Sequence, residues 1–131
     1  FQGVIEMARI LVIDDHYPMR QTIREILEDN GHDVLEAANG FSGLQIQRTQ
    51  HADLVITDIF MPEKEGMSTI REMCNEFPGI RTIAMSGGTG DLTAPESFID
   101  LARRFGARAT IVKPFEVDDF LAVVNQVLCE E

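Results

Sequence analysis

Residues 54–62 read LVITDIFMP, and the aspartate in this stretch, Asp58, carries more information than any other residue of the chain. The four apolar or β-branched residues before it are typical of a buried strand, and Pro62 cannot simply continue that strand. We therefore expect Asp58 to lie where a strand ends. In open parallel α/β sheets, ligands bind at the carboxyl ends of the strands.

A second apolar run, residues 9–13 (RILVI), ends in the same way, with Asp14 and Asp15. If the two strands are neighbours, three carboxylates meet at one edge of the sheet. They would repel one another strongly unless a cation lay among them, and Mg²⁺ prefers such oxygen ligands. An N-terminal helix cap is the alternative role for Asp14 and Asp15, because aspartate is favoured there.

Two more strand-like runs end in polar side chains. Residues 80–85 precede Ser86, and residues 109–112 precede Lys113, Pro114 and Phe115. The strand ends thus offer a nucleophile, a metal site, a hydroxyl donor and a cation. This set fits phosphoryl transfer to a carboxylate, in which positioning and charge stabilisation supply most of the catalysis.

Taken in order, these motifs resemble the response-regulator receiver domain of two-component signalling. The resemblance extends from about Arg9 to Cys129 and rests on Asp14-Asp15, Asp58-x-x-Met61-Pro62-x-x-x-Gly66, Ser86 and Lys113-Pro114-Phe115. It implies an α/β fold of the flavodoxin-like type, a doubly wound five-stranded parallel sheet of order 2-1-3-4-5 with five helices. Residues 7–131 would form this single domain, and residues 1–6 would be a tag remnant and leader.

The resemblance also implies a role for each acidic residue. Asp58 would accept the phosphoryl group and, with Asp15, ligate Mg²⁺ directly. Asp14 would act largely through water, and the backbone carbonyl of Phe60 would complete the protein ligands.

Two further residues would act on the phosphoryl group. Lys113 would approach it as a point charge, held by a Lys113–Pro114 bond that is typically cis in the family. Ser86 would donate its hydroxyl. Taken alone, an exposed lysine is usually only solvated, and a strand-end serine often just opens a turn.

The chain departs from the family pattern at two places. Thr110 stands where receivers usually carry a tyrosine or phenylalanine that moves on activation, so that part of the switch is missing. The segment from Ser86 to Lys113 is also longer than usual by about one helical turn. The surplus is best placed in residues 87–94, either as a lid over the phosphate or as a tolerated surface insertion.

Bulk properties restrict the function further. The net charge of −11 argues against nucleic-acid binding by this segment, because phosphate contacts need clusters of Lys and Arg. No apolar stretch approaches the roughly 20 residues that span a membrane, and no secretion signal is recognisable. We therefore expect a cytoplasmic protein in which Cys74 and Cys129 are reduced.

The expected partners follow from the resemblance. They are a sensor histidine kinase or phosphotransfer protein, a downstream protein or output domain, and a second copy of the chain. The protein would catalyse only its own phosphorylation and dephosphorylation.

Other functions remain open at this point. A phosphatase of the haloacid-dehalogenase type needs Asp-x-Asp after the first strand, where this chain has Asp14, Asp15 and His16. Flavin-binding modules of the same topology need a phosphate loop, and cobalamin-binding modules need a glycine, that this chain lacks. A degenerate receiver that only docks would keep the fold without binding Mg²⁺.

The pattern alternates strand and helix five times, which predicts parallel strands with right-handed crossovers. Strands are expected at residues 9–13, 32–38, 53–57, 80–85 and 109–112. The helix near residues 40–50 is the least periodic. In the last two helices the predicted inward stripes are Phe98, Leu101, Ala102 and Phe105, then Val117, Phe120, Leu121, Val124 and Leu128. The three histidines, His16, His32 and His51, are interpreted as surface or turn residues.

Overall fold

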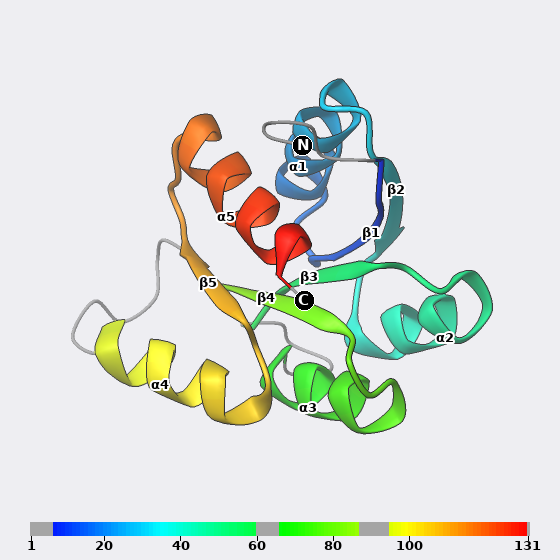
Figure 1. Cartoon of the computed structure of the whole chain (residues 1–131), viewed down its shortest axis with the longest axis vertical. Coiled ribbons are helices and arrows are strands. Elements are labelled where there is room, and N and C mark those ends of the chain that lie inside the picture. Colours follow the sequence, from blue (N-terminus) through cyan, green and yellow to red (C-terminus); the bar gives the residue numbers. More distant parts are fainter. Residues whose placement is uncertain (1–6, 60–65, 87–94, 131) are drawn as a thin grey trace.

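The computed structural model describes residues 7–59, 66–86 and 95–130, with the backbone alone for residues 95–99. Strands and helices alternate along the chain (Figure 1). The strands are β1 (Arg9–Ile13), β2 (Asp33–Ala37), β3 (Leu54–Asp58), β4 (Arg81–Ser86) and β5 (Ala109–Val112). The helices are α1 (Tyr17–Asp29), α2 (Gly40–Gln50), α3 (Gly66–Glu76), α4 (Pro95–Phe105) and α5 (Val117–Cys129). No helix among these residues is long and apolar enough to cross a membrane.

The five strands form one parallel sheet in the order β2-β1-β3-β4-β5. Helices α1 and α5 cover one face, and α2, α3 and α4 cover the other (Figure 1). The predicted doubly wound, flavodoxin-like fold is confirmed. The strand order reverses between β1 and β3, and the carboxyl ends of strands at such a switch point form the usual ligand site of this architecture.

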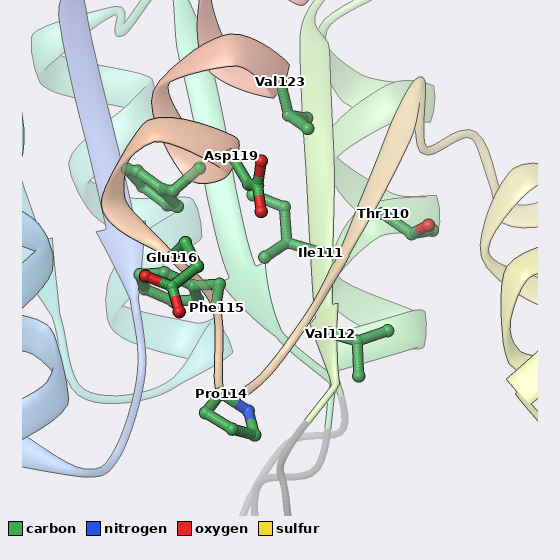
Figure 2. A pocket seen from close by; sticks show the side chains of 9 residues that line it. Thr110, Ile111, Val112, Pro114, Phe115, Glu116, Asp119 and Val123 are labelled. Carbon is green, nitrogen blue, oxygen red and sulfur yellow. The ribbon is translucent and has the colours of Figure 1, made fainter.

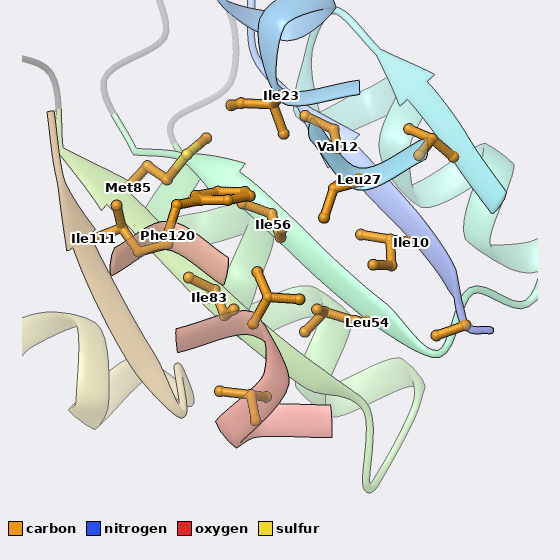
Figure 3. Packing of buried hydrophobic residues seen from close by; sticks show 14 residues of the cluster. Ile10, Val12, Ile23, Leu27, Leu54, Ile56, Ile83, Met85, Ile111 and Phe120 are labelled. Atoms are coloured by element: carbon orange, nitrogen blue, oxygen red, sulfur yellow. The ribbon is translucent and has the colours of Figure 1, made fainter. Parts of the chain in front are cut away.

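The strands are apolar throughout because both faces of the sheet are covered. On the α1 and α5 side, the ring of Phe120 packs among buried side chains of the central strands (Figure 3). Figure 3 labels the main members of this layer, Ile10, Val12, Ile23, Leu27, Leu54, Ile56, Ile83, Met85, Ile111 and Phe120. Alternate strand residues, such as Leu11 and Ile13, pack on the opposite side against α2 and α3.

Two of the predicted inward positions are wrong. Val117 is 48% exposed, because the ring of Phe115 instead stacks on Phe120 at the start of α5, with 4.9 Å between the ring centroids. Leu101 is 43% exposed. Its neighbour Ala102 is the residue that faces α3, and consecutive helix positions point about 100° apart. The side chain of Phe98 lies outside the described residues.

Helix α2 forms despite its weak periodicity, and two residues explain why. The Asn39 side chain accepts a hydrogen bond from the Ser42 N–H at 2.9 Å, which caps the helix at its start. At Gly43 a Cβ would overlap the side chain of Ile13. Glycine therefore lowers the intrinsic helix propensity here but lets the helix pack closely against β1.

His32 lies in the turn between α1 and β2, as interpreted, but it is buried, so the interpretation of it as a surface residue is wrong. Its Nδ1 accepts a hydrogen bond from the Ala8 N–H at 3.1 Å, so this nitrogen carries no proton. Burial lowers the pKa of His32 below its ordinary value, because it disfavours the imidazolium.

We expect His32 to make the free energy of unfolding depend on pH. In the unfolded chain His32 titrates at about pH 6.5, whereas in the folded protein it takes up a proton only at lower pH. The unfolded state therefore binds more protons as the pH falls below about 6.5, and the stability from neutral His32 is progressively lost. Urea unfolding over a pH series should show a smaller loss in His32→Asn, which retains an acceptor but does not titrate.

The exposed His51 supplies the control. In the same pH range, the free energy of unfolding of His51→Asn should change with pH as it does in the wild type. The same pH dependence of the free energy of unfolding in His32→Asn and in the wild type would contradict the role assigned to His32.

Candidate phosphoacceptor and metal site

The three predicted acidic residues come together at the carboxyl ends of β1 and β3. One carboxylate oxygen from each of Asp14, Asp15 and Asp58 lies within 4.8 Å of the other two. Asp14 and Asp58 are buried, whereas Asp15 is exposed. The cluster is therefore closed on the sheet side and accessible from the side of Asp15.

Lys113 reaches this cluster from the end of β5. Its Nζ donates to Asp58 Oδ2 at 3.0 Å and to Asp14 Oδ2 at 3.1 Å, and its side chain is only 10% exposed. Burial lowers the pKa of Lys113, but the two carboxylates raise it more, so the net shift is upward. A freely solvated lysine, the alternative on sequence grounds, is excluded. The predicted cis bond between Lys113 and Pro114 is present.

Asp14 is held through both its backbone and its side chain. Its N–H donates to the Ala37 carbonyl at 3.1 Å, and its Oδ1 accepts from the His16 N–H at 2.9 Å. The residue that caps α1 is His16, without a side-chain cap bond, so the alternative role of the acidic pair as the helix cap is not what the structure shows. Asp14 instead forms a tight local turn that directs its other oxygen to Lys113.

Asp58 is the last residue of β3, and the peptide that joins it to Ile59 is held at both its N–H and its carbonyl. The Ile59 N–H donates to the Met85 carbonyl at 3.0 Å, and the Thr57 hydroxyl donates to the Asp58 carbonyl at 3.0 Å. Gly66 begins α3 directly against this segment, and its N–H donates to the Ile59 carbonyl at 3.1 Å. A Cβ on Gly66 would overlap the Asp58 carbonyl and the Ile59 backbone.

Gly66→Ala should therefore cost roughly 2–3 kcal/mol of folding free energy. The added methyl group meets backbone, which cannot rotate away, so α3 must move off the end of β3. Urea unfolding would measure the loss, with Ser68→Ala on the exposed side of the same helix as the control. Equal stability of the two variants would contradict the close approach.

Ser86 lies next to the cluster, at the end of β4. It is half-buried and follows Met85, the residue aligned with Asp58 in the sheet. Its backbone carbonyl accepts from the Lys113 N–H at 3.0 Å, which ties the β4 and β5 ends together. The structure thus brings Ser86 beside Asp58 and Lys113.

Two of the sequence predictions fall outside the described residues. The backbone carbonyl of Phe60, expected as a metal ligand, is one of them. The segment 87–94, interpreted as a lid or as a surface insertion, is the other. Both therefore stay predictions.

Thr110 lies on β5, at a separate groove of about 280 Å³ between this strand and α5. Figure 2 shows Thr110 and Val112 on one side of the strand and Ile111 on the other, as strand alternation requires. Asp119 contributes a carboxylate to the wall of the groove. A small hydroxyl side chain thus occupies the position at which the resemblance leads us to expect an aromatic ring.

The residues of the acidic cluster fit Mg²⁺. Their donors are all carboxylate oxygens, the kind this hard cation prefers. Three carboxylates and the Lys113 ammonium leave an excess of negative charge, most of it shielded from water. Asp14, Asp15 and Asp58 are the side chains that would hold the ion, with the accessible side left for water or phosphate oxygens.

One residue at the site was missed by sequence reasoning. Arg20 donates from Nη1 to the backbone carbonyl of Asp14 at 2.6 Å. Its position one turn into a helix that follows an acidic pair is the signal in the sequence. That signal becomes specific only once the path of the turn is known.

Comparisons with known proteins point to one family. A family model described as the response regulator receiver domain matches residues 10–125. Chemotaxis protein CheY of Bacillus subtilis is 36% identical over 121 residues, covering 92% of this chain and 97% of the relative. Sporulation initiation phosphotransferase F of the same organism is 30% identical over 120 residues, covering 92% and 93%.

A solved structure shows the same architecture. The crystal structure of NtrX from Brucella abortus in complex with ADP superimposes with a TM-score of 0.85 and 28% identity, over 94% of this chain. This chain spans 27% of the length of that NtrX chain.

Proposed function

Because the chain belongs to the family of response regulator receiver domains, a module of two-component and phosphorelay signalling, we propose that Asp58 accepts a phosphoryl group from a histidine kinase or phosphotransfer protein. The observation that carries this proposal is the contact of the Lys113 ammonium with Asp58 and Asp14, next to Asp15. The alternative of a haloacid-dehalogenase phosphatase is not favoured.

The reaction is an in-line displacement at phosphorus. A carboxylate oxygen of Asp58 forms a new bond to the phosphorus atom, and the bond from phosphorus to the donor nitrogen or oxygen breaks. The donor leaves with the electron pair of that bond and takes up a proton. Asp58 becomes an acyl phosphate, which water later hydrolyses to carboxylate and inorganic phosphate.

Each neighbour of Asp58 has a role that its position supports. Mg²⁺, when bound by the acidic cluster, offsets negative charge on the transferring group. Lys113 lies within hydrogen-bond reach of Asp58, so a small movement of its ammonium brings it to a phosphoryl oxygen. Ser86 at the adjacent strand end would donate its hydroxyl to another such oxygen.

The signalling output would follow from a shift in the populations of two conformations of the protein. Contacts to the phosphoryl group that exist in only one conformation, such as those from Ser86 and Lys113, would favour that conformation. Binding partners would then distinguish the two states. A cytoplasmic location, a separate output domain and self-association belong to this proposal as expectations.

The test is the intact mass of the protein after incubation with acetyl phosphate. We expect a single gain of about 80 Da, the mass of one phosphoryl group, that requires Mg²⁺. Without an adduct, tight Mg²⁺-dependent binding of beryllofluoride would indicate rapid hydrolysis. Failure of both would refute the phosphoacceptor role and favour a receiver that only docks.

A further inference from the structure

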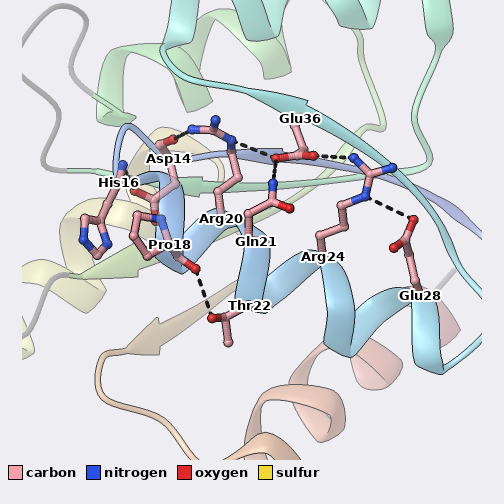
Figure 4. Close-up of polar contacts among 9 residues, drawn as sticks. All are labelled: Asp14, His16, Pro18, Arg20, Gln21, Thr22, Arg24, Glu28 and Glu36. Carbon is pink, nitrogen blue, oxygen red and sulfur yellow. Dashed lines mark hydrogen bonds and ion pairs between the residues drawn. The ribbon is translucent and has the colours of Figure 1, made fainter.

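A polar network between α1 and β2 extends to Asp14 (Figure 4). At its centre, the Glu36 carboxylate accepts hydrogen bonds from Arg20 Nε at 2.9 Å and from Gln21 Nε2 at 2.7 Å. Arg24 forms a further ion pair with the second oxygen of Glu36. Three side chains of α1 thus converge on one carboxylate of the neighbouring strand.

Arg20 connects this network to the acidic pair. While its Nε is bound to Glu36, its Nη1 donates to the Asp14 carbonyl oxygen at 2.6 Å (Figure 4). The side chains of Arg20 and Glu36 are only 13% and 18% exposed. The guanidinium is planar, so the bond to Glu36 also sets the direction of the bond to Asp14.

The Asp14 carbonyl belongs to the peptide that joins Asp14 to Asp15. A peptide is planar, so holding its oxygen restricts the orientation of the unit between the two carboxylate-bearing residues. Repulsion among Asp14, Asp15 and Asp58 tends to turn this peptide and separate the carboxylates. The bond from Arg20 to the carbonyl oxygen opposes that movement.

Glu36 keeps Arg20 in this role. Burial raises the pKa of Glu36, but its hydrogen bonds and ion pairs with Arg24 and Arg20 lower it more, and the net shift is downward. Glu36 is therefore ionised at neutral pH and balances the Arg20 charge. An unbalanced guanidinium would be drawn to the nearby acidic cluster, where it would compete with a cation.

We propose that Arg20, oriented by Glu36, is a positioning residue that preorganises the Asp14-Asp15 pair for Mg²⁺. The inference rests on the proposed function, because it needs a cluster that binds the ion. Arg20 donates to the backbone of Asp14 and to Glu36, and as a cation it would not itself be a ligand of the ion. Residues of this kind, one contact removed from the ligands, typically change metal affinity by about 10- to 100-fold.

The test is the Mg²⁺ affinity of purified variants, measured by titration calorimetry with the metal alone. Arg20→Gln should bind Mg²⁺ about tenfold more weakly than the wild type. Arg24→Gln is the matched control, because Arg24 pairs with Glu36 and Glu28 at the end of the network away from Asp14. It should leave the affinity unchanged even where it lowers the stability.

A second readout separates positioning from folding. In the Mg²⁺-free protein, the His16 amide is bound to Asp14 Oδ1, and its hydrogen exchange should accelerate in Arg20→Gln but not in Arg24→Gln. If Arg20→Gln does not fold, Arg20→Lys retains the charge without the planar fork and should still bind Mg²⁺ more weakly than the wild type.

The outcomes distinguish this inference from the proposed function. A wild type that binds no Mg²⁺ would overturn the metal site itself, and the role of Arg20 with it. A wild type that binds Mg²⁺, with equal affinity in the folded Arg20 variant, would overturn the positioning role alone. Equal losses in the Arg20 and Arg24 variants would also overturn it, because only Arg20 contacts the acidic turn.

Discussion

Asp58→Asn is expected to abolish the Mg²⁺-dependent phosphoryl adduct. The amide has no anionic oxygen to attack phosphorus, and loss of a nucleophile lowers such rates on the order of a thousandfold or more. The side chain keeps its size, so the position at the end of β3 remains filled. Intact mass after incubation with acetyl phosphate, beside the wild type, measures the effect directly.

The control for this prediction is Asp29→Asn, at the exposed end of α1. It removes one negative charge from the surface and should be phosphorylated like the wild type. An adduct of unchanged yield in Asp58→Asn would contradict the assignment. The peptide that then carries the phosphoryl group would identify the true acceptor, with Asp14 and Asp15 as the nearest carboxylates.

Lys113→Met is expected to destabilise the Mg²⁺-free protein by about 3 kcal/mol. Its ammonium is the partner of two buried carboxylates, and removing one member of a buried ion pair leaves uncompensated charge. Methionine fills much of the space of the lysine stem, so the loss is mainly electrostatic. Urea unfolding in the presence of a chelator gives the free energy of unfolding.

Mg²⁺ should stabilise Lys113→Met more than it stabilises the wild type. The ion supplies positive charge to the same carboxylates, and ligands that bind only the folded state raise its stability. Arg48→Met is the control, because it breaks the exposed pair with Glu76 and should cost much less. A Lys113→Met protein as stable as Arg48→Met without Mg²⁺ would show that the contacts of Lys113 contribute little.

Much of the fold follows from local pattern. The apolar runs at residues 9–13, 54–57 and 109–112 form strands as predicted. Helices cover both faces of a parallel sheet, so its strands are apolar on both sides. Gly31 follows α1 with a φ of +87°, as a residue that ends a helix should. The second strand is one residue shorter at each end than predicted, since pairing with β1 sets its limits.

The burial of single side chains was less predictable. His32 resembles an exposed turn residue in the sequence, yet it is buried and accepts a hydrogen bond from the Ala8 N–H, just before β1. Val117 was expected inside, but Phe115 takes the place near Phe120. In both cases a residue outside the regular helix or strand decides the environment, and hydrophobic periodicity describes only one helix or strand at a time.

The sequence by itself determined which chemical groups stand at the strand ends, because strand and turn propensities act over a few residues. Only the tertiary structure decided that Lys113 reaches Asp14, 99 residues earlier in the chain, and that Arg20 holds the Asp14 carbonyl. It also explains Gly66, whose missing side chain lets α3 approach the backbone of Asp58. These contacts depend on strand order and on the direction of side chains, which the packing of the whole sheet sets.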